Sequence, residues 1–285
     1  MQIRWDGHTH TEMCPHGSGD STAAMVEKAI RLGFTDYSIT EHAPLPTGFR
    51  NIYVGDAVAY DTASLFFDQV DDYFNHVEEL KETYKDKIRI HIGFEFDYIP
   101  GFDDECKAFL NEIGGRLDDA LLSVHFMDGA NDGFWCIDYS PEEFETGFGY
   151  LLKNPQELFG HYWKLVELAV NADWGKYTPK RIGHIDNIKK YQDYFGWNRD
   201  WGMKVNLQID RILDTLADQG RSLDMNVAGL YKPYCNDVCP GLPIFQRAMA
   251  RKIPWVYGSD SHSIADVGHG HYITEFLEKT KFKAK

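Results

Sequence analysis

The chain has 285 residues, and its 29 basic and 44 acidic residues give it a formal charge of −15. This acidic balance disfavours nucleic acid as a partner, and no apolar run is long enough to span a membrane. With 43% hydrophobic and 14% aromatic residues the chain can bury a sizeable core, and its length fits one large α/β barrel or two ordinary domains.

The first half of the chain alternates predicted strands with predicted helices. Asp20 or Ser21 can cap the first helix, and Gly33 can end it. The apolar spacing predicts a strand over 2–8, a helix over 20–32, a strand over 34–40, a helix over 64–84, a strand over 88–95, a helix over 103–113 and a strand over 120–125.

Segment 126–154 is rich in Gly, Asp and aromatic residues and has no sustained period, so it is interpreted as an insertion that could cover a pocket. The alternation then resumes with helices over 156–172, 203–219 and 242–251 and strands over 181–184, 222–226 and 254–259. Seven β/α steps are typical of parallel strands wrapped by helices, in an open sheet or in a barrel.

Seven histidines and two carboxylates stand in short patches where predicted strands run out into loops. They are His8, His10, His16, His42, Glu95, His125, His184, Asp260 and His262. Residues at the C-terminal ends of many strands converge only if the strands form a ring, so these patches favour a barrel. We therefore expect a single barrel domain over 1–285, because no repeat or linker indicates a second one.

Imidazole and carboxylate together are suitable ligands for Zn, Fe or Mn. Residues i and i+2 of a strand point to the same side, so His8 and His10 can hold one metal, and Asp260 and His262 can do the same from another strand. Glu95 can bridge two metals, which an imidazole cannot do. Any single histidine is as often a hydrogen-bonded core residue as a ligand, but that explanation would require every patch to fall at a strand end by accident.

The remaining histidines have no ligand-like neighbours, and we expect packing or surface roles for them. They are His76, His161, His269 and His271. His91 shares the strand parity of Glu95 and could face the barrel interior, but we expect packing or support of a ligand for it. Asp97 is an alternative carboxylate to Glu95, although its place beyond the predicted strand end favours a loop role.

In order, the patches DGHTH followed by His16, then EH, a strand-end Glu, SVH, GH and SDSH resemble the PHP family, named for polymerase and histidinol phosphatase. The longer runs DGHTHTEMCPHG, SITEHAP, HIGFEFDY, RIGHID, DMNVAGLYKP and YGSDSH are similar to its stand-alone histidinol-phosphatase branch. The resemblance covers essentially the whole chain. It implies a distorted seven-stranded (β/α)7 barrel, similar to a TIM barrel, that holds three divalent metals at the C-terminal ends of its strands.

The resemblance also implies a ligand set. A first metal would be held by His8, His10, Glu95 and Asp260, a second by Glu95, His125 and His184, and a third by His16, His42 and His262. The implied reaction is hydrolysis of L-histidinol phosphate to L-histidinol and phosphate in histidine biosynthesis, by attack of a hydroxide that bridges two metals. Glu95, Asp260 and His262 are the expected catalytic residues. The leaving alcohol needs a proton, which a metal-bound water, Asp260 or a histidine could supply.

Substrate contacts are less sharply predicted. Arg181 and Lys232 are candidate donors to the phosphate, although each is more often a solvated surface charge. The candidate partners of the substrate's ammonium and imidazole groups are Glu12, Asp128, Asp132 and Asp138.

Three alternatives remain. A PHP-type phosphoesterase could act on a different small phosphate ester or on a nucleotide. An amidohydrolase-type barrel also begins with H-x-H, but it usually adds a strand-end lysine that this chain lacks. A metal-binding module without catalysis is disfavoured, because nine ligands over three metals leave positions open for water and substrate.

Five cysteines, an odd number without regular spacing, indicate a reduced cytoplasmic protein. Cys235 and Cys239 form one C-x3-C pair, which is too little for a structural zinc site. The N-terminal MQIRWDGHTH has no apolar signal core, so we expect a soluble cytoplasmic enzyme. The sequence makes no prediction of oligomeric state.

Overall fold

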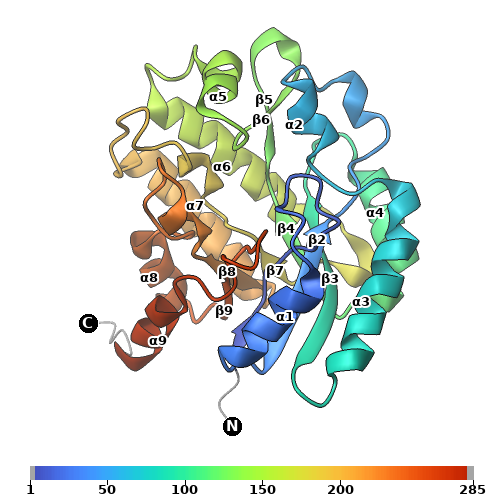
Figure 1. Ribbon diagram of the computed structural model, residues 1–285. Helices are drawn as coiled ribbons and strands as arrows, with labels where there is room; N and C mark the ends of the chain where they lie inside the picture. The colour runs from blue at the N-terminus through green and yellow to red at the C-terminus, as the bar shows by residue number, and fades with distance from the viewer. Residues whose placement is uncertain (1–3, 281–285) are drawn as a thin grey trace.

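The computed structural model describes residues 4–280, and within them seven strands form a closed barrel. Every strand runs parallel to its neighbours, and β1 closes the ring between β2 and β9 (Figure 1). The predicted seven-stranded barrel is therefore confirmed. Its strands are β1 (Trp5–Asp6), β2 (Asp36–His42), β3 (Arg89–Asp97), β4 (Asp119–Ser123), β7 (Arg181–Ile182), β8 (Ser222–Asn226) and β9 (Trp255–Gly258).

Helices surround the barrel and bury their apolar faces against it (Figure 1). Val26 and Val77 of two of these helices belong to the same buried cluster as Ile39 and Ile92 of the strands. Full burial of such a side chain contributes about 1.5–3 kcal/mol, which accounts for the helical spacing in the sequence. The helices are α1 (Thr22–Arg31), α3 (Val70–Tyr84), α4 (Asp103–Ile113), α6 (Pro155–Asn171), α7 (Gly202–Asp218), α8 (Leu242–Ala250) and α9 (His271–Thr280).

Helix α1 is capped by a residue other than the two predicted. Among the described residues the Ser21 side chain makes no capping bond, and Glu12 Oε2 instead accepts a hydrogen bond from the backbone nitrogen of Thr22 at 2.9 Å. Asp20 Oδ2 accepts from the backbone nitrogen of Ile264 at 2.8 Å. Asp20 therefore joins the first loop of the chain to the last one instead of capping the helix.

Several predicted boundaries differ from the structure by one or two residues, and two differ by more. The helix expected over 64–84 begins at Val70, because a 3-10 turn (Phe67–Gln69) precedes it and the Gln69 side chain accepts a hydrogen bond from Phe66 N at 2.8 Å. The strand expected over 2–8 is described only as Trp5–Asp6, and residues 2 and 3 lie outside the described range. A short helix that was not predicted, α2 (Ala57–Asp61), follows β2.

The predicted insertion over 126–154 contains regular structure. β5 (Phe126–Asp128) and β6 (Phe134–Cys136) form an antiparallel hairpin, which helix α5 (Pro141–Phe148) follows. The hairpin, α5 and α2 lie at the upper end of the molecule in Figure 1. Phe126 and Cys136 of the hairpin pack in a small second core with Phe49, which follows β2. Strands of three residues are too short to show a period, so the sequence pattern did not reveal them.

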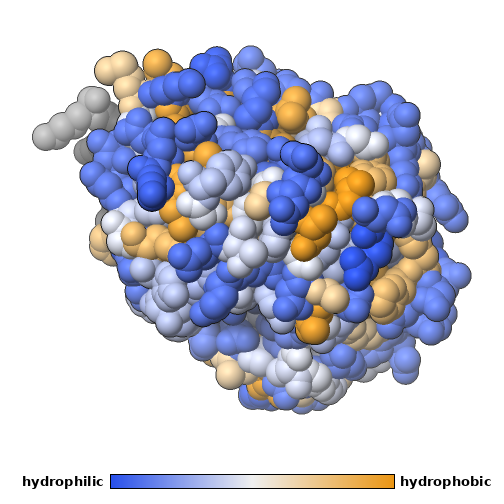
Figure 2. Space-filling model, turned by 90° about the horizontal axis from the view of Figure 1, so that it is seen from above, coloured by the Kyte–Doolittle hydropathy of each residue, from blue (hydrophilic) through white to orange (hydrophobic). Residues whose placement is uncertain are grey.

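The surface is mostly polar. Figure 2 looks down on the molecule from above and shows mainly hydrophilic residues with small, separate hydrophobic areas. Among residues 4–280, no helix has both the length and the hydropathy that crossing a bilayer would require.

Candidate metal centre

The nine predicted ligands lie together at the C-terminal ends of the barrel strands. The Glu95 carboxylate is at the middle of the cluster and is fully buried. Its Oε2 atom lies 3.2 Å from His8 Nε2 and 3.2 Å from His42 Nδ1, and its Oε1 atom lies 2.9 Å from His184 Nε2. One carboxylate therefore contacts histidines from three different strand ends.

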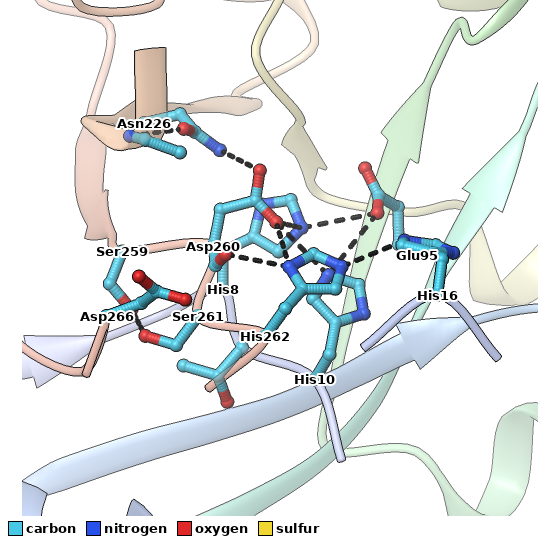
Figure 3. Close-up of polar contacts among 12 residues, drawn as sticks. His8, His10, His16, Glu95, Asn226, Ser259, Asp260, Ser261, His262 and Asp266 are labelled. Carbon is cyan, nitrogen blue, oxygen red and sulfur yellow. Dashed lines mark hydrogen bonds and ion pairs between the residues drawn. The ribbon is translucent and has the colours of Figure 1, made fainter. Parts of the chain in front are cut away.

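Two groups of donors share Glu95. In the first, the ligand atoms of His8, His10 and Glu95 lie within 4.8 Å of one another, and Asp260 Oδ1 is 3.2 Å from His10 Nε2 (Figure 3). In the second, Glu95 meets His125 and His184 within the same limit. Each group offers enough donors for one divalent ion.

A third group joins His10, Cys14, His42 and His262 within 4.8 Å. His16 reaches the same place from an exposed position, with its Nε2 atom 3.0 Å from His262 Nε2 (Figure 3). Cys14 belongs to the run DGHTHTEMCPHG but was not among the predicted ligands. Burial raises the pKa of the Cys14 thiol above its ordinary value, so the thiol is protonated and is a weaker donor than the imidazoles.

The arrangement of the ring nitrogens fits bound metal. His125 Nε2 lies 3.1 Å from His184 Nε2, a spacing close to that between two nitrogens that share a tetrahedral zinc at about 2.0–2.1 Å from each. Among the described residues neither ring nitrogen of the buried His42 makes a hydrogen bond, although Nδ1 lies 3.2 Å from Glu95 Oε2. Buried polar atoms normally have partners, so an ion is a reasonable partner for these nitrogens.

In three of these imidazole rings, Nδ1 lies within hydrogen-bonding distance of a carboxylate oxygen. Metal-binding histidines typically donate their second N–H in this way, which fixes the tautomer and aims the other nitrogen at the ion. The pairs, with their N–O distances, are His8 with Asp224 (2.7 Å), His10 with Glu41 (3.1 Å) and His125 with Asp97 (2.9 Å). Asp97 is the last residue of β3 and orients a predicted ligand, whereas the sequence favoured a loop role for it and offered it as an alternative to Glu95. Glu41 and Asp224 were not predicted at all.

Close packing and an unusual backbone conformation position the remaining carboxylate. Gly258 has no room for a side chain, because a Cβ atom there would collide with Asp224 Oδ1. Two residues later, the backbone of Asp260 has a φ of 54°, in the left-handed region, which Asp tolerates better than most residues. Asn226 Nδ2 donates to Asp260 Oδ2 at 3.2 Å (Figure 3) and to Asp224 Oδ2 at 3.1 Å.

The electrostatics of the cluster favour added positive charge. Burial alone would lower the pKa of His10, but hydrogen bonds with Asp260 and Glu41 outweigh it and raise the pKa to about 9. Burial would raise the pKa of Glu95, yet the surrounding histidines, His8 foremost, hold it well below its usual range. Without metal the cluster therefore binds protons on imidazoles beside charged carboxylates, and cations can replace those protons.

A cavity adjoins the cluster. Glu95 and Asp260 of the predicted site line it together with Asp138, Lys190 and Lys232. Lys190 Nζ lies 3.0 Å from Asp138 Oδ2. Within residues 4–280 the Lys232 ammonium has no hydrogen bond or ion pair, so it is free to bind an anion.

Two predicted substrate contacts need correction. The Arg181 side chain is buried inside the barrel, where it donates to Gly7 O at 2.6 Å and pairs with Asp119, and it does not line the cavity. Glu12 is occupied at the start of α1 and lies 3.3 Å from His76 Nε2, and it does not line the cavity.

The acidic residues of the insertion also differ from one another. Asp128 pairs with His161 at 2.9 Å, and neither Asp128 nor Asp132 lines the cavity. Asp138 does line it. His91 bonds to Asp36 Oδ1 at 3.0 Å, away from the ligands. Of these predicted contacts, only Lys232 and Asp138 reach the cavity.

A closed β/α barrel whose strand ends bring histidines and carboxylates together beside a cavity is the architecture of a metal-dependent enzyme. The family model described as the PHP domain matches residues 6–228, and the chain belongs to this family.

Known relatives resemble the chain over nearly its full length. A histidinol-phosphatase of Bacillus subtilis is 33% identical over 279 residues, which covers 98% of this chain and 100% of the relative. The solved structure of a candidate histidinol phosphatase, HisK, from Listeria monocytogenes has a TM-score of 0.92 and 40% identity, and the match covers 95% of this chain and 99% of that one. The Lactococcus lactis histidinol phosphate phosphatase, solved with Zn, L-histidinol and phosphate, has a TM-score of 0.65 and 19% identity, with 98% and 94% covered. At that identity the last match shows the fold alone.

Proposed function

We propose that the protein is a metal-dependent phosphomonoesterase that hydrolyses L-histidinol phosphate to L-histidinol and phosphate in histidine biosynthesis. The observation that carries this proposal is the convergence of nine histidine and carboxylate donors beside a cavity with an unpaired lysine. The full-length similarity to the B. subtilis histidinol-phosphatase supports the choice of substrate. The five free cysteines favour a reducing cytoplasm as the place of reaction.

Three divalent ions, Zn, Fe or Mn, fit the donor groups. We assign His8, His10, Glu95 and Asp260 to the first ion, Glu95, His125 and His184 to the second, and His16, His42 and His262 to the third. When bound, such ions lower the pKa of water and neutralise the charge of a phosphate ester. Burial lowers the pKa of His262 to about 3, so its ring is neutral and able to act as a ligand near neutral pH.

Two further residues that line the cavity are candidates to bind the substrate. The Lys232 ammonium can bind a phosphate oxygen, because no other described residue neutralises it. Asp138 can accept a hydrogen bond from the ammonium group of histidinol. Lys190 keeps the pKa of Asp138 below its ordinary value against the effect of burial, so this carboxylate is charged.

Asp260 is the best-placed residue for proton transfer. Its side chain is 20% exposed, whereas that of Glu95 is 0% exposed. Burial would raise the pKa of Asp260, but His8 and a hydrogen bond with His10 hold it well below its usual range. The ionised Asp260 carboxylate lines the cavity with Oδ2 held by Asn226, so it is positioned to take a proton from the attacking water and pass it to the departing alcohol oxygen.

The proposal is tested with purified, metal-loaded protein and a panel containing L-histidinol phosphate, an aryl phosphate and a nucleoside monophosphate. We expect kcat/KM to be highest for L-histidinol phosphate. Equal values for the aryl phosphate would overturn the substrate assignment and favour a phosphoesterase of different specificity. No hydrolysis of any ester would overturn the phosphatase itself.

A further inference from the structure

One side chain, that of Asn226 at the end of β8, joins two parts of the site that lie on different loops. It is buried and lines the cavity. Its Nδ2 atom donates to Asp224 Oδ2 and Asp260 Oδ2, and its Oδ1 atom accepts from the backbone nitrogen of Ala228 at 3.0 Å. The metal centre and the loop that follows β8 therefore meet at a single amide group.

These contacts fix the orientation of the amide and use both of its N–H groups. A side-chain amide has two N–H donors and one acceptor oxygen, and the two carboxylates take the donors. Turning the group over would place its oxygen against two carboxylate oxygens and its nitrogen against the N–H of Ala228. Asn226 thus has no N–H to offer a phosphate, so its effect on a substrate must act through the groups that it holds.

The backbone of Asn226 is held as well as its side chain. Asn226 N donates to Cys239 O at 2.7 Å, and Cys239 N donates to Asn226 O at 2.8 Å. The next residue, Val227, donates its backbone N–H to Gly258 O of β9 at 3.0 Å. Neighbouring segments therefore fix the backbone on both sides, and the amide group is a rigid support for its partners.

The contact with Ala228 determines where Lys232 lies. Ala228 is the first residue of a 3-10 turn (Ala228–Tyr231), and Lys232 follows directly after this turn. Lys232 N donates back to Gly229 O at 3.3 Å, so the lysine backbone is part of the same hydrogen-bonded unit. Asn226 Oδ1 therefore anchors the start of the turn that presents the lysine to the cavity.

The position of this turn matters because the Lys232 ammonium has no partner of its own among residues 4–280. A lysine in an ion pair would keep its ammonium in place even if its backbone moved. Lys232 lacks that restraint, so its backbone alone limits where the ammonium can reach. The same amide holds Asp260 Oδ2 (Figure 3). One side chain thus sets the distance between the candidate phosphate donor and a candidate metal ligand.

We propose that Asn226 is a positioning residue for the phosphate group, because it holds the turn that carries Lys232 at a fixed distance from Asp260. This inference rests on the proposed function and extends it, since that function gives Asn226 a part only in holding Asp260. It has a specific consequence. The loss of the Asn226 side chain should weaken phosphate binding only while Lys232 is present.

The test is a double-mutant cycle on full-length, zinc-loaded protein, with inorganic phosphate as the probe. Isothermal titration calorimetry measures the phosphate Kd of the wild type, of Asn226→Ala, of Lys232→Met and of the double variant. Asn226→Ala should raise Kd about tenfold in the wild-type background and less than about twofold in the Lys232→Met background. An equal increase in both backgrounds, or no increase in either, would overturn the proposal.

Steady-state kinetics with L-histidinol phosphate measure the same coupling. KM should rise about tenfold in Asn226→Ala, whereas the double variant should have a KM within about twofold of that of Lys232→Met. A purely structural role would instead raise KM equally in both backgrounds. The matched control Asn171→Ala removes an exposed amide at the end of α6 and should leave both Kd and KM unchanged.

Hydrogen exchange tests the anchoring of the turn independently of bound zinc. The N–H of Ala228 is bonded to Asn226 Oδ1, so its exchange reports how often this contact opens. Asn226→Ala should speed exchange in peptides covering 228–232 at least about tenfold, and Asn171→Ala should not. Unchanged exchange in Asn226→Ala would mean that the turn is held without this side chain, and the positioning role would be wrong.

Failure of the proposed function gives a different result. Zinc-loaded protein would then hydrolyse no L-histidinol phosphate, while the calorimetric cycle and the exchange rates would still decide the role of Asn226. Normal hydrolysis together with a cycle that shows no coupling would overturn the positioning role alone.

Discussion

Asp224 Oδ2 lies 2.7 Å from His8 Nδ1, and neither side chain is exposed. The contact joins the end of β8 to the segment that follows β1. It leaves His8 Nε2 facing Glu95 at 3.2 Å. A buried carboxylate that is not itself in any of the donor groups thus decides how a proposed ligand is presented.

Asp224→Asn should lower zinc affinity by about 10- to 100-fold, because the amide keeps the shape but removes the charge that orients the imidazole. Competition with a chromophoric chelator measures this affinity. Asp214→Asn, at an exposed carboxylate paired with Arg251, is the matched control and should bind zinc normally. Unchanged affinity in Asp224→Asn would contradict an orienting role.

Glu95→Gln should reduce turnover by more than about a hundredfold, beyond the range expected for a carboxylate that only orients a ligand. The reason is that Glu95 contacts histidines of two donor groups, so its loss affects both. Circular dichroism should show an unchanged fold. Glu78→Gln, exposed on α3, is the control, and wild-type turnover in Glu95→Gln would show that the cluster is wrongly assigned.

Lys232→Met should lower kcat/KM for L-histidinol phosphate by about 10- to 100-fold, since a hydrogen bond to a charged group contributes about 1.5–3 kcal/mol. Steady-state kinetics at saturating metal give the value. Lys85→Met removes a lysine from an exposed ion pair with Glu82 and should have no effect. Equal kinetics in the two variants would remove Lys232 from the phosphate site.

Arg181→Met should lower the free energy of unfolding. Removing the guanidinium leaves Asp119 without its buried partner, and breaking such a pair typically costs about 3–5 kcal/mol. Urea denaturation followed by fluorescence measures the free energy of unfolding, with the exposed Arg211→Met as control. If Arg181→Met raised KM and left stability normal, Arg181 would be a substrate contact after all.

The metal-free protein should lose stability as the pH rises. The pKa of His10 is raised to about 9 and that of His125 to about 10, against about 6.5 in the unfolded chain. Their contribution to stability is complete below pH 6.5 and disappears as the pH passes through 9 to 10. The Tm of chelator-treated protein should fall over this range. Zinc-loaded protein, in which metal replaces the protons, should not show this fall, and parallel curves for the two forms would contradict this prediction.

The barrel was predictable because each strand carries its own local signal. In β3 apolar residues alternate with other residues, and the helices repeat their apolar positions at helical spacing. The insertion was not predictable in detail, because β5 and β6 have three residues each and are stabilised by contacts with a distant loop near Phe49.

The site was predictable as far as the donors themselves. Their carboxylate partners depend on which strands face each other across the barrel, and a linear pattern does not contain that information. A weak signal existed for Asp224, which shares strand parity with Asn226 at the end of β8. Arg181 was predicted as a phosphate donor from its charge, because a sequence does not distinguish a buried arginine from one that binds an anion.

The placement of β1 between β2 and β9 has a consequence for biosynthesis. His8 O accepts from Asp260 N at 2.8 Å, and Ser261 O accepts from His10 N at 3.0 Å, so the first and last donors of the chain share one backbone ladder. A ribosome releases His8 long before it releases Asp260. The proposed first and third donor groups therefore stay incomplete until Asp260 and His262 are added, whereas the group of Glu95, His125 and His184 is already present.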